Sequence, residues 1–428
     1  SIPLLFRDLE SILDKKSSIE LNIPFSFLSK TILSEVISPT FLTADKPNSI
    51  SSAAENDLET IIKRAKDWQK KKYEAGWAML HWPEEYGGIN ASPIERIIWT
   101  QEQAKFDVPG SIFEIGLGMC GPVLMEYATE EQKKRYLPPM AEGKEIWCQL
   151  FSEPSAGSDV AGLRSKAEKD GDDWIINGQK VWTSGAHYSD YGILVVRHDA
   201  SLQKHKGLTF FFVDMKSPGI TVKPIKQITG TAGSGAGFNE VYFDNVRIPD
   251  SQRLGEIGDG WKVAITTLMN ERLAVGDARG TDIEEALNLA KEKDDDGDAL
   301  IKNQAVRDRL ADWFCQASGL KYTKFRTMSA LSKGEAPGPE ASITKVVSAG
   351  KLQEIGNFGI DAGDMAGMLL DEDNWDPFQS AWLGAPGLRI AGGTDEILKN
   401  IIAERVLGLP QDPRADKGVP FNEIPQGK

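Results

Sequence analysis

The chain has little cysteine and histidine for its length. Its 428 residues include three cysteines that are far apart in the sequence. An odd, dispersed set of cysteines gives no disulfide or zinc framework and suits a reducing compartment, so we expect a cytoplasmic protein. Four histidines show no metal-ligand spacing, and no metal site is expected. They are His81, His187, His198 and His205.

Long apolar runs and clustered positive charge are also missing. No apolar run is long enough to span a bilayer, so we expect a soluble protein. The segment Ser1–Phe6 has no basic region and no small-residue cleavage site, so no signal peptide is expected. The net charge of -14 argues against a nucleic-acid surface, which needs clustered Lys and Arg. A local basic pocket for a phosphorylated ligand is still compatible with an acidic chain.

The residue pattern predicts a multidomain α+β chain in five segments. Residues 1–52 are an irregular extension, and residues 53–146 form a helical domain that begins with apolar residues at helical spacing from Leu58 to Trp68. Residues 147–255 contain short β-rich runs without helices between them, which indicates a small antiparallel barrel or sandwich. Residues 256–410 form a four-helix-type bundle, and residues 411–428 are a tail. The helices are expected at 93–106, 129–140, 261–275, 283–293, 306–332, 340–355 and 394–407.

Three short patterns have local interpretations. Asn177-Gly178 lies between two apolar runs, which predicts a two-residue hairpin turn. A GxGxG pattern at 233–237 is followed by a strand-like run instead of a helix, so we interpret it as a loop and not as a phosphate-binding turn. The acidic run at 294–298 lacks the Glu that a calcium loop needs at its twelfth position, Asn303, and is interpreted as a solvated connector.

Two segments of the middle region carry the chemistry. Cys148–Ala161 is rich in hydroxyls and glycine, which is typical of a loop close to a flat or phosphorylated ligand. Gly178–Gly185 places Trp182 beside Thr183 and Ser184. The indole can cover an aromatic ring while a hydroxyl binds the edge of that ring.

Both segments resemble the flavin-binding signature of the acyl-CoA dehydrogenase family. Gly392–Ile397 and Asn400–Pro410 resemble its closing signature, and the match extends from about Trp77 to Pro410. The resemblance implies an FAD-dependent oxidoreductase of lipid β-oxidation that converts an acyl-CoA thioester to trans-2-enoyl-CoA. A carboxylate takes the α-proton and flavin N5 accepts the β-hydride. An electron-transferring flavoprotein is the implied electron acceptor.

Glu271 is the predicted catalytic base. Ala264, Leu268, Glu271 and Val275 share one helical face, where a carboxylate needs a partner or a role. From the spacing alone, a solvent-facing or Arg-paired glutamate is favoured. In the resembling family the base lies either just before the closing Gly-Thr, where Gly392 has no side chain, or on the first helix of the bundle. The second placement resembles the isovaleryl- and long-chain-type enzymes and indicates Glu271. Arg272 is assigned to substrate anchoring or to a structural salt bridge.

The resemblance also implies the ligand contacts. The N–H of Gly392 and a flavin ribityl hydroxyl would bind the thioester oxygen, which is oxyanion-type stabilisation. Ser158 is placed near the CoA portion of the substrate and the flavin phosphates. The remaining flavin contacts are Gln149, Phe151 and Ser152 at the isoalloxazine edge, Trp182 at its face, Thr183 and Ser184 at N5, and Thr394 and Glu396 at the ribityl and adenosine parts.

Two features of the family are missing. An Arg-x-x-Phe-Gly segment is replaced by a run without that Arg, and a Gly-Gly-x-Gly turn is replaced by Asn357–Ala366. The chain is therefore expected to be one subunit of an α2β2 complex, or a homodimer or tetramer that binds the adenine by other residues. An acyl-CoA oxidase, a non-catalytic partner subunit and a DNA-associated relative are the alternatives, and the acidic charge opposes the last. No single residue defines the acyl chain.

Overall fold

The computed structural model describes residues 58–103, 106, 108–109, 112–228, 237–275, 281–293, 297–333, 338–339, 341–369 and 376–425. All of them belong to the unit Pro47–Lys428. The expected extension 1–52 and most of the GxGxG pattern lie outside these residues, as does most of the acidic run at 294–298. The expected domain boundaries remain a prediction.

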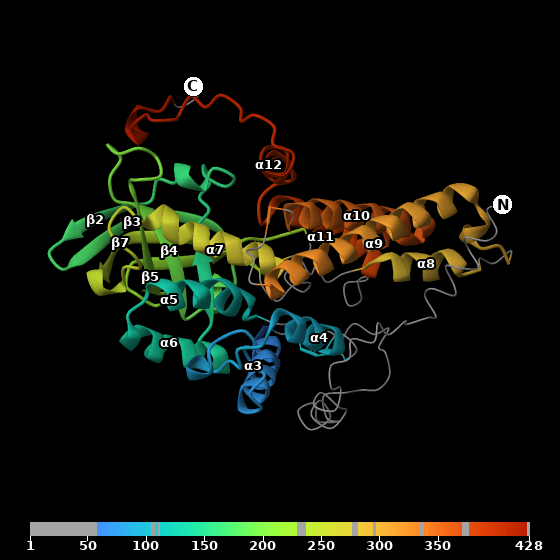
Figure 1. Cartoon of the computed structure of the whole chain (residues 1–428), viewed down its shortest axis with the longest axis horizontal. Helices are drawn as coiled ribbons and strands as arrows, with labels where there is room; N and C mark the ends of the chain where they lie inside the picture. The colour runs from blue at the N-terminus through green and yellow to red at the C-terminus, as the bar shows by residue number, and fades with distance from the viewer. Residues whose placement is uncertain are drawn as a thin grey trace. The chain divides into compact units, whose positions relative to one another are not determined.

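The first described region is helical, as expected. It contains α3 (Leu58–Glu74), α4 (Pro93–Gln103), α5 (Gly121–Tyr127) and α6 (Glu130–Glu142) (Figure 1). Helix α3 buries Ala65 and Trp68 on the face that its apolar spacing predicts. Thr129 is the N-cap of α6, and its hydroxyl accepts from the Gln132 N–H in a capping box. Helix α5 and the π turn before it (η3, Gly116–Cys120) were not predicted, since glycine and proline interrupt their sequence.

The middle region is a seven-stranded sheet. Its strands are β1 (Trp147–Leu150), β2 (Lys166–Asp170), β3 (Asp173–Ser184), β4 (Tyr191–Arg197), β5 (Leu208–Asp214), β6 (Ile220–Pro224) and β7 (Phe238–Pro249). The order is β1-β4-β2-β3-β7-β6, and β5 pairs with β4. The pairs are antiparallel except those of β4 with β1 and β2, which are parallel. The expected β domain between two helical regions is confirmed, but it is not wholly antiparallel, because β4 pairs in parallel with β1 and β2.

The hairpin predicted at Asn177-Gly178 is wrong. Strand β3 runs through both residues without a turn and pairs with β7 on each side of them, with a register shift between Ile176 and Gly178. Gly178 has a φ of 154° and lies so close to Ser165 that a Cβ would come within 2.2 Å of the serine oxygen. The glycine therefore serves a bulge and a close approach instead of a turn. The tight hairpin joins β2 to β3, where Asp170 pairs with Asp173.

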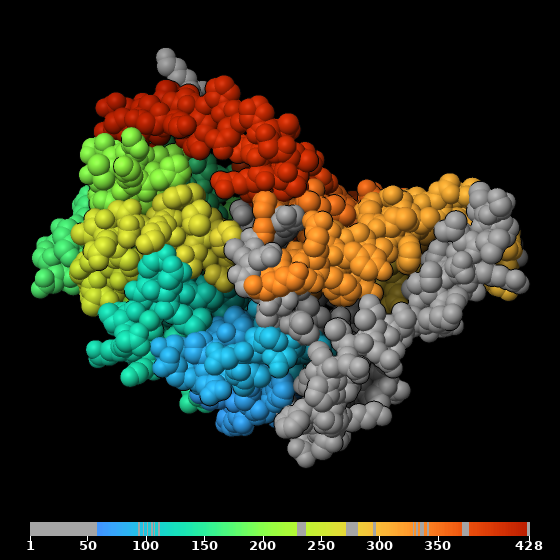
Figure 2. All heavy atoms as spheres, viewed as in Figure 1, coloured from blue at the N-terminus to red at the C-terminus, as the bar shows by residue number. Residues whose placement is uncertain are grey.

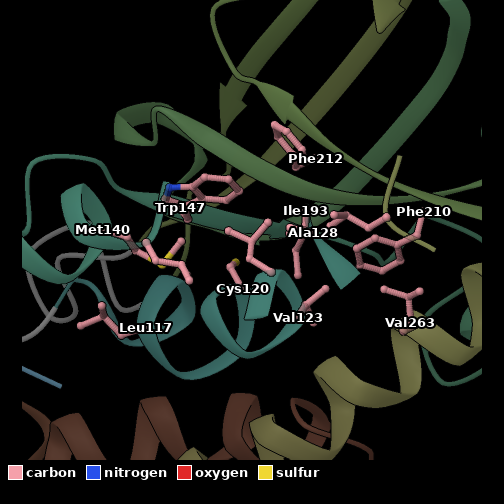
Figure 3. Packing of buried hydrophobic residues seen from close by; sticks show 14 of the residues in the cluster. Leu117, Cys120, Val123, Ala128, Met140, Trp147, Ile193, Phe210, Phe212 and Val263 are labelled. Carbon is pink, nitrogen blue, oxygen red and sulfur yellow. The ribbon is translucent and has the colours of Figure 1, made fainter. Parts of the chain in front are cut away.

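Both faces of the sheet are covered by protein. Ile193 and Val195 of β4 pack in a core shared with α5 and α6, whereas Leu194 and Val196 pack in a second core on the other face. The alternation follows from the period of two in a strand. Figure 3 shows the first core, in which residues of η3 and α5 meet Trp147 of β1 and Phe210 and Phe212 of β5. This packing fixes β1 and the loop that follows it.

The last region is a set of long helices. They are α7 (Gly260–Val275), α8 (Ile283–Lys291), α9 (Gln304–Ser332), α10 (Ala341–Ala362), α11 (Pro377–Ile390) and α12 (Asp395–Ile401), which continues as a π turn (η9, Ile402–Val406). The helical bundle is confirmed. Within the described residues, none of the helices combines the length and the apolar character needed to cross a membrane.

Helices α10 and α11 differ from the prediction. Helix α10 extends seven residues beyond Ile355 into the segment Asn357–Ala366, and α11 was not predicted at all. A Cβ on Gly356 would come within 2.7 Å of the backbone nitrogen of Trp382, and a Cβ on Gly359 within 2.0 Å of the Phe378 ring. The glycines thus let α11 lie close against α10, and this packing offsets their low helix propensity.

The C-terminal tail returns to the sheet. The Phe421 and Asn422 N–H groups donate to the carbonyls of Leu202 and Ala200, at 2.9 and 3.0 Å. In Figure 2 the red atoms of this segment lie against the green atoms of the middle domain. The tail therefore belongs structurally to the loop between β4 and β5.

Candidate functional site

Trp182 combines an exposed ring with an unusual backbone. Its side chain is 56% exposed although its neighbours Val181 and Thr183 are buried, and its φ is 61°. The β3–β7 register shifts between Lys180 and Thr183, so Trp182 lies on a bulge. Its ring meets Phe238 edge to face at 5.8 Å. A positive φ is costly for a large residue, and an exposed indole held this way suits a flat aromatic ligand.

The two hydroxyls beside Trp182 have different surroundings. Ser184 is half-buried, whereas Thr183 is 2% exposed and its Oγ1 has no hydrogen-bond partner among the described residues. The Thr183 carbonyl accepts from the buried Asn239 amide at 2.9 Å. Trp182 and Ser184 are thus the accessible positions of this strand end, and Thr183 is enclosed. Ser184 is the better placed of the two to meet a ligand on the indole side.

A buried ion pair joins the two sequence segments. Lys180 Nζ lies 2.8 Å from Glu153 Oε1 and donates to the Phe151 carbonyl at 3.0 Å. The Glu153 carboxylate also accepts from the N–H groups of Arg164 and Ser165. Burial opposes its ionisation, but Lys180 and these hydrogen bonds hold the Glu153 pKa below its usual value. The loop after β1 is therefore fastened to β3 two residues before Trp182.

The residues of β1 and the loop after it differ in how far they are exposed. Gln149 and Ser152 are half-buried, and the Ser152 carbonyl accepts from the Val181 N–H at 2.9 Å. Phe151 is buried and meets Phe210 edge to face, so its backbone and not its ring is left for a ligand. Ser158 is exposed. The structure thus brings Gln149–Ser152 together with Lys180–Ser184.

The closing signature forms a two-glycine turn between α11 and α12. Gly392 and Gly393 have φ values of 65° and 94°. The Thr394 hydroxyl caps α12 by accepting from the Ile397 N–H at 3.3 Å. Glu396 is exposed, and hydrogen bonds from its own backbone N–H and from Thr394 lower its pKa. The described residues show no hydrogen bond between this turn and either middle-domain segment.

Glu271 and Arg272 lie on helix α7, but their side chains are outside the described residues. Val263, Ala264 and Thr267 of this helix are fully buried. Glu271 follows Thr267 by four residues, about one helical turn. Helical spacing therefore places position 271 on the same side of α7 as Thr267. The role predicted for Glu271 remains a prediction.

The side chains at the end of β3 suit a flat aromatic ligand such as a flavin better than a metal ion. An exposed indole and a hydroxyl share the end of β3, and the loop beside them is fixed by a buried ion pair. In the ranges that the structure describes, no cluster of three His, Cys, Asp or Glu side chains is arranged to hold a metal ion. Trp182 and Ser184 are the exposed and half-buried side chains at this strand end.

Several site features were missed from the sequence. The Lys180–Glu153 pair joins residues 27 apart, and no local pattern marks it. Lys204 binds Asp159 at 2.6 Å and Asp416 at 2.8 Å, so the tail also reaches the end of the β1 loop. The Phe421 ring lies 3.5 Å from the Arg197 guanidinium, which donates to the carbonyls of Ala161 and Leu163. A lone acidic or aromatic residue in a tail gives no signal of such a partner.

Three family models match the chain in succession. They describe the N-terminal domain of acyl-CoA dehydrogenase over residues 47–144, its middle domain over 148–246 and its C-terminal domain over 258–407. A curated relative, acyl-CoA dehydrogenase IpdE1 of Mycobacterium tuberculosis, is 36% identical over 349 residues, which are 81% of this chain and 88% of the relative.

Solved structures with this fold include two whose titles each join two names. A structure titled Tcur3481-Tcur3483 steroid ACAD matches with a TM-score of 0.74 and 27% identity, over 91% of this chain and 98% of that one. The ChsE4-ChsE5 complex from Mycobacterium tuberculosis matches with a TM-score of 0.69 and 28% identity, over 86% of this chain and 100% of the other. Both titles name two different proteins.

Proposed function

This chain belongs to the acyl-CoA dehydrogenase family, and from that premise we propose that it desaturates an acyl-CoA thioester to the trans-2-enoyl-CoA. The family consists of flavin-dependent oxidoreductases, and we propose FAD as the cofactor. The bound flavin would accept a hydride from the substrate β-carbon at N5. The substrate loses the α-proton and the β-hydride, and a carbon–carbon double bond forms between the two carbons. The observation that carries the proposal is the exposed Trp182 at φ 61°, held beside the fixed β1 loop.

We assign proton removal to Glu271. Gly392 occupies the other position at which the family places its base, and it has no side chain. Helix α7 is the first helix of the C-terminal bundle, and it buries Val263, Ala264 and Thr267 on the face that Glu271 continues. A carboxylate that is partly removed from water has a raised pKa, nearer to what a general base needs at neutral pH. Arg272 is assigned to the substrate side of the same helix.

The N–H of Gly392 is the proposed donor to the thioester oxygen. It lies in a left-handed turn, and among the described residues no protein group accepts a hydrogen bond from it. A donor left free in this way can bind an oxygen on which negative charge develops as the α-proton leaves. One such donor contributes about 3 kcal/mol to stabilising the transition state.

The remaining ligand contacts are proposed as follows. Trp182 covers one face of the isoalloxazine and Ser184 binds near N5, whereas the enclosed Thr183 Oγ1 reaches a ligand only if the strand end shifts. Gln149 and the backbones of Phe151 and Ser152 meet the edge of the ring. Ser158, Thr394 and Glu396 are exposed or half-buried. Ser158 would lie near the CoA portion of the substrate and the flavin phosphates, and Thr394 and Glu396 near the ribityl and adenosine parts of the flavin.

A heteromeric enzyme is the second candidate. The titles of two similar structures each name two proteins. In this chain, α10 continues as a helix where the family has its Gly-Gly-x-Gly turn. A related subunit would then complete the adenine end of the site. A homodimer or tetramer in which other residues bind the adenine is the alternative. We also propose a cytoplasmic location and an electron-transferring flavoprotein as electron acceptor.

The proposal is tested on the purified chain alone and after coexpression with related chains. Heat-released cofactor is identified by mass as FAD or another flavin, and the thioester product is examined for the loss of two hydrogens. Steroid-like thioesters belong in the panel, because one similar structure is titled a steroid ACAD. Loss of two hydrogens without peroxide supports the dehydrogenase, and stoichiometric peroxide would identify an oxidase. A folded chain that binds FAD only with a second chain would establish the heteromer.

A further inference from the structure

Lys345 of α10 reaches the turn that closes the family signature. Its side chain is largely buried, and its Nζ donates to the Gly393 carbonyl at 2.7 Å. Lys345 comes from a helix that begins 51 residues before Gly392. The contact therefore joins the turn to the first part of α10, which lies far from the turn in the sequence.

A second ion pair holds the two sides of the same turn. Arg389, in the last turn of α11, donates from Nε to Asp395 Oδ2 at 2.7 Å, and Asp395 is the first residue of α12. Arg389 also donates to Gln353 Oε1 on α10 at 2.8 Å. The residues before and after the turn are thus joined to each other and to α10.

Asp395 connects the two sets of contacts. Its carboxylate is 4% exposed, and Oδ1 has no hydrogen bond in the described part of the chain but lies 3.7 Å from the Lys345 ammonium. A buried carboxylate loses its hydration and needs cations nearby. Lys345 and Arg389 supply them on opposite oxygens. A buried ammonium has the same need, which Asp395 and the Gly393 carbonyl meet.

The turn itself has little to restrain it. Gly392 and Gly393 have no side chains to pack, and both have positive φ values that other residues rarely adopt. The Gly392 N–H lies in the peptide plane between Ala391 and Gly392, so its orientation relative to α12 depends on the dihedral angles of both glycines. With the Gly393 carbonyl bound by Lys345 and both flanks joined by Arg389 and Asp395, those angles are fixed from outside the turn.

We propose that Lys345 is a positioning residue that holds the Gly392–Gly393 turn so that the Gly392 N–H meets the thioester oxygen. This inference rests on the proposed function, and it adds a residue that acts through the turn without touching the substrate. Its effect should fall on kcat more than on KM, since the N–H contact strengthens as charge develops on the oxygen.

The test compares Lys345→Met with Lys351→Met in the flavin-loaded enzyme. Lys351 is a matched control, because it is a buried lysine on the same helix that pairs with Asp282, the N-cap of α8, at 2.5 Å. We expect Lys345→Met to lower kcat about 10- to 100-fold with KM within about threefold, as a misplaced donor does. Lys351→Met should leave kcat within about twofold, and Lys345→Arg, which keeps a charged donor, should recover part of the loss.

Backbone hydrogen exchange gives a readout that does not depend on turnover. Peptides covering 389–398 should exchange faster in Lys345→Met than in wild type or Lys351→Met. Unchanged exchange, or a kcat within about twofold of wild type, would overturn the proposal. If Lys345→Met does not fold, Asp395→Asn is measured in its place and should show the same pattern more weakly. A wild-type enzyme that acts on no thioester would instead refute the proposed function, while the exchange data would still decide whether Lys345 holds the turn.

Discussion

The Lys180 ammonium lies 2.8 Å from the Glu153 carboxylate with both side chains enclosed by protein. Removing one partner of a buried pair leaves an uncompensated charge, which costs about 3–5 kcal/mol. Glu153→Gln should therefore lower the free energy of unfolding by about that amount in urea denaturation. Lys169→Met is the control, since Lys169 pairs with Asp250 at the surface and should change stability by less than about 1 kcal/mol. Equal effects of the two variants would contradict this account of the β1 loop.

Replacing Trp182 should keep or raise the stability of the apoprotein and weaken flavin binding. Trp182→Gly relieves the positive φ and should leave the apoprotein as stable as wild type or more stable by about 1 kcal/mol. Flavin affinity should fall at least tenfold, measured by equilibrium titration of the apoprotein. Asn245→Gly relieves a φ of 51° in β7 and should leave flavin affinity unchanged. Undiminished affinity in Trp182→Gly would rule out stacking by this ring.

The neighbouring hydroxyls should respond in opposite ways. Thr183→Val removes a buried oxygen that has no partner in the described residues, so stability should hold or rise by about 1 kcal/mol with flavin affinity kept. Ser184→Ala should weaken flavin binding or slow flavin reduction at unchanged stability. Calorimetric unfolding measures the stability of both variants, and titration with flavin measures their flavin affinity. A loss of flavin affinity in Thr183→Val alone would assign the N5 contact to Thr183.

The helices and strands with regular apolar spacing were predictable, whereas contacts across the chain were not. Ala65 and Trp68 on α3 face the core as their spacing indicates. Helix α11 was missed because Pro386 and two glycines interrupt its pattern, and it is stabilised by the Asp376 capping box and by packing on Gly359. Asn177-Gly178 has the composition of a hairpin turn, but pairing with β7 carries the strand straight through it.

The sequence likewise indicated some residues of the candidate site and not others. The resemblance assigned Trp182 and Ser184 to flavin contacts, which stays a prediction, and the structure places their strand beside the β1 loop. Lys180, Lys345 and Lys204 were not predicted, because each has a partner that only the folded chain brings near.

Burial of Cys148 predicts a pH dependence. Burial raises the pKa of its thiol from 9.0 to about 12. Between these values the folded protein keeps the proton and the unfolded chain releases it, so stability should fall as pH rises, by up to about 1.4 kcal/mol per pH unit. Urea unfolding of wild type and Cys148→Ala at pH 8.5 and 10 measures the difference. The variant should lose less stability than wild type over this range, and identical pH slopes would contradict the prediction.

The tail should stabilise the end of the β1 loop through Asp416. Lys204 pairs with Asp159 and Asp416, and Asp159 is the more exposed of the two. Removing the Asp416 carboxylate therefore takes away the less exposed partner. In Asp416→Asn, peptides covering 157–164 should exchange backbone hydrogens faster, while Asp412→Asn, a change at an exposed tail position, should not alter them. Unaltered exchange in Asp416→Asn would show that the loop is held without the tail.

Glu271 is the residue proposed to remove the α-proton. The direct measurement is the rate at which the visible absorbance of the bound oxidised flavin bleaches, without oxygen, after mixing with the thioester that wild type reduces fastest. In Glu271→Gln the rate should fall about 10²- to 10⁴-fold with thioester binding retained. Glu256→Gln, a change at an exposed glutamate, should bleach at the wild-type rate. Bleaching of Glu271→Gln within a few-fold of wild type would contradict the account and place the base elsewhere.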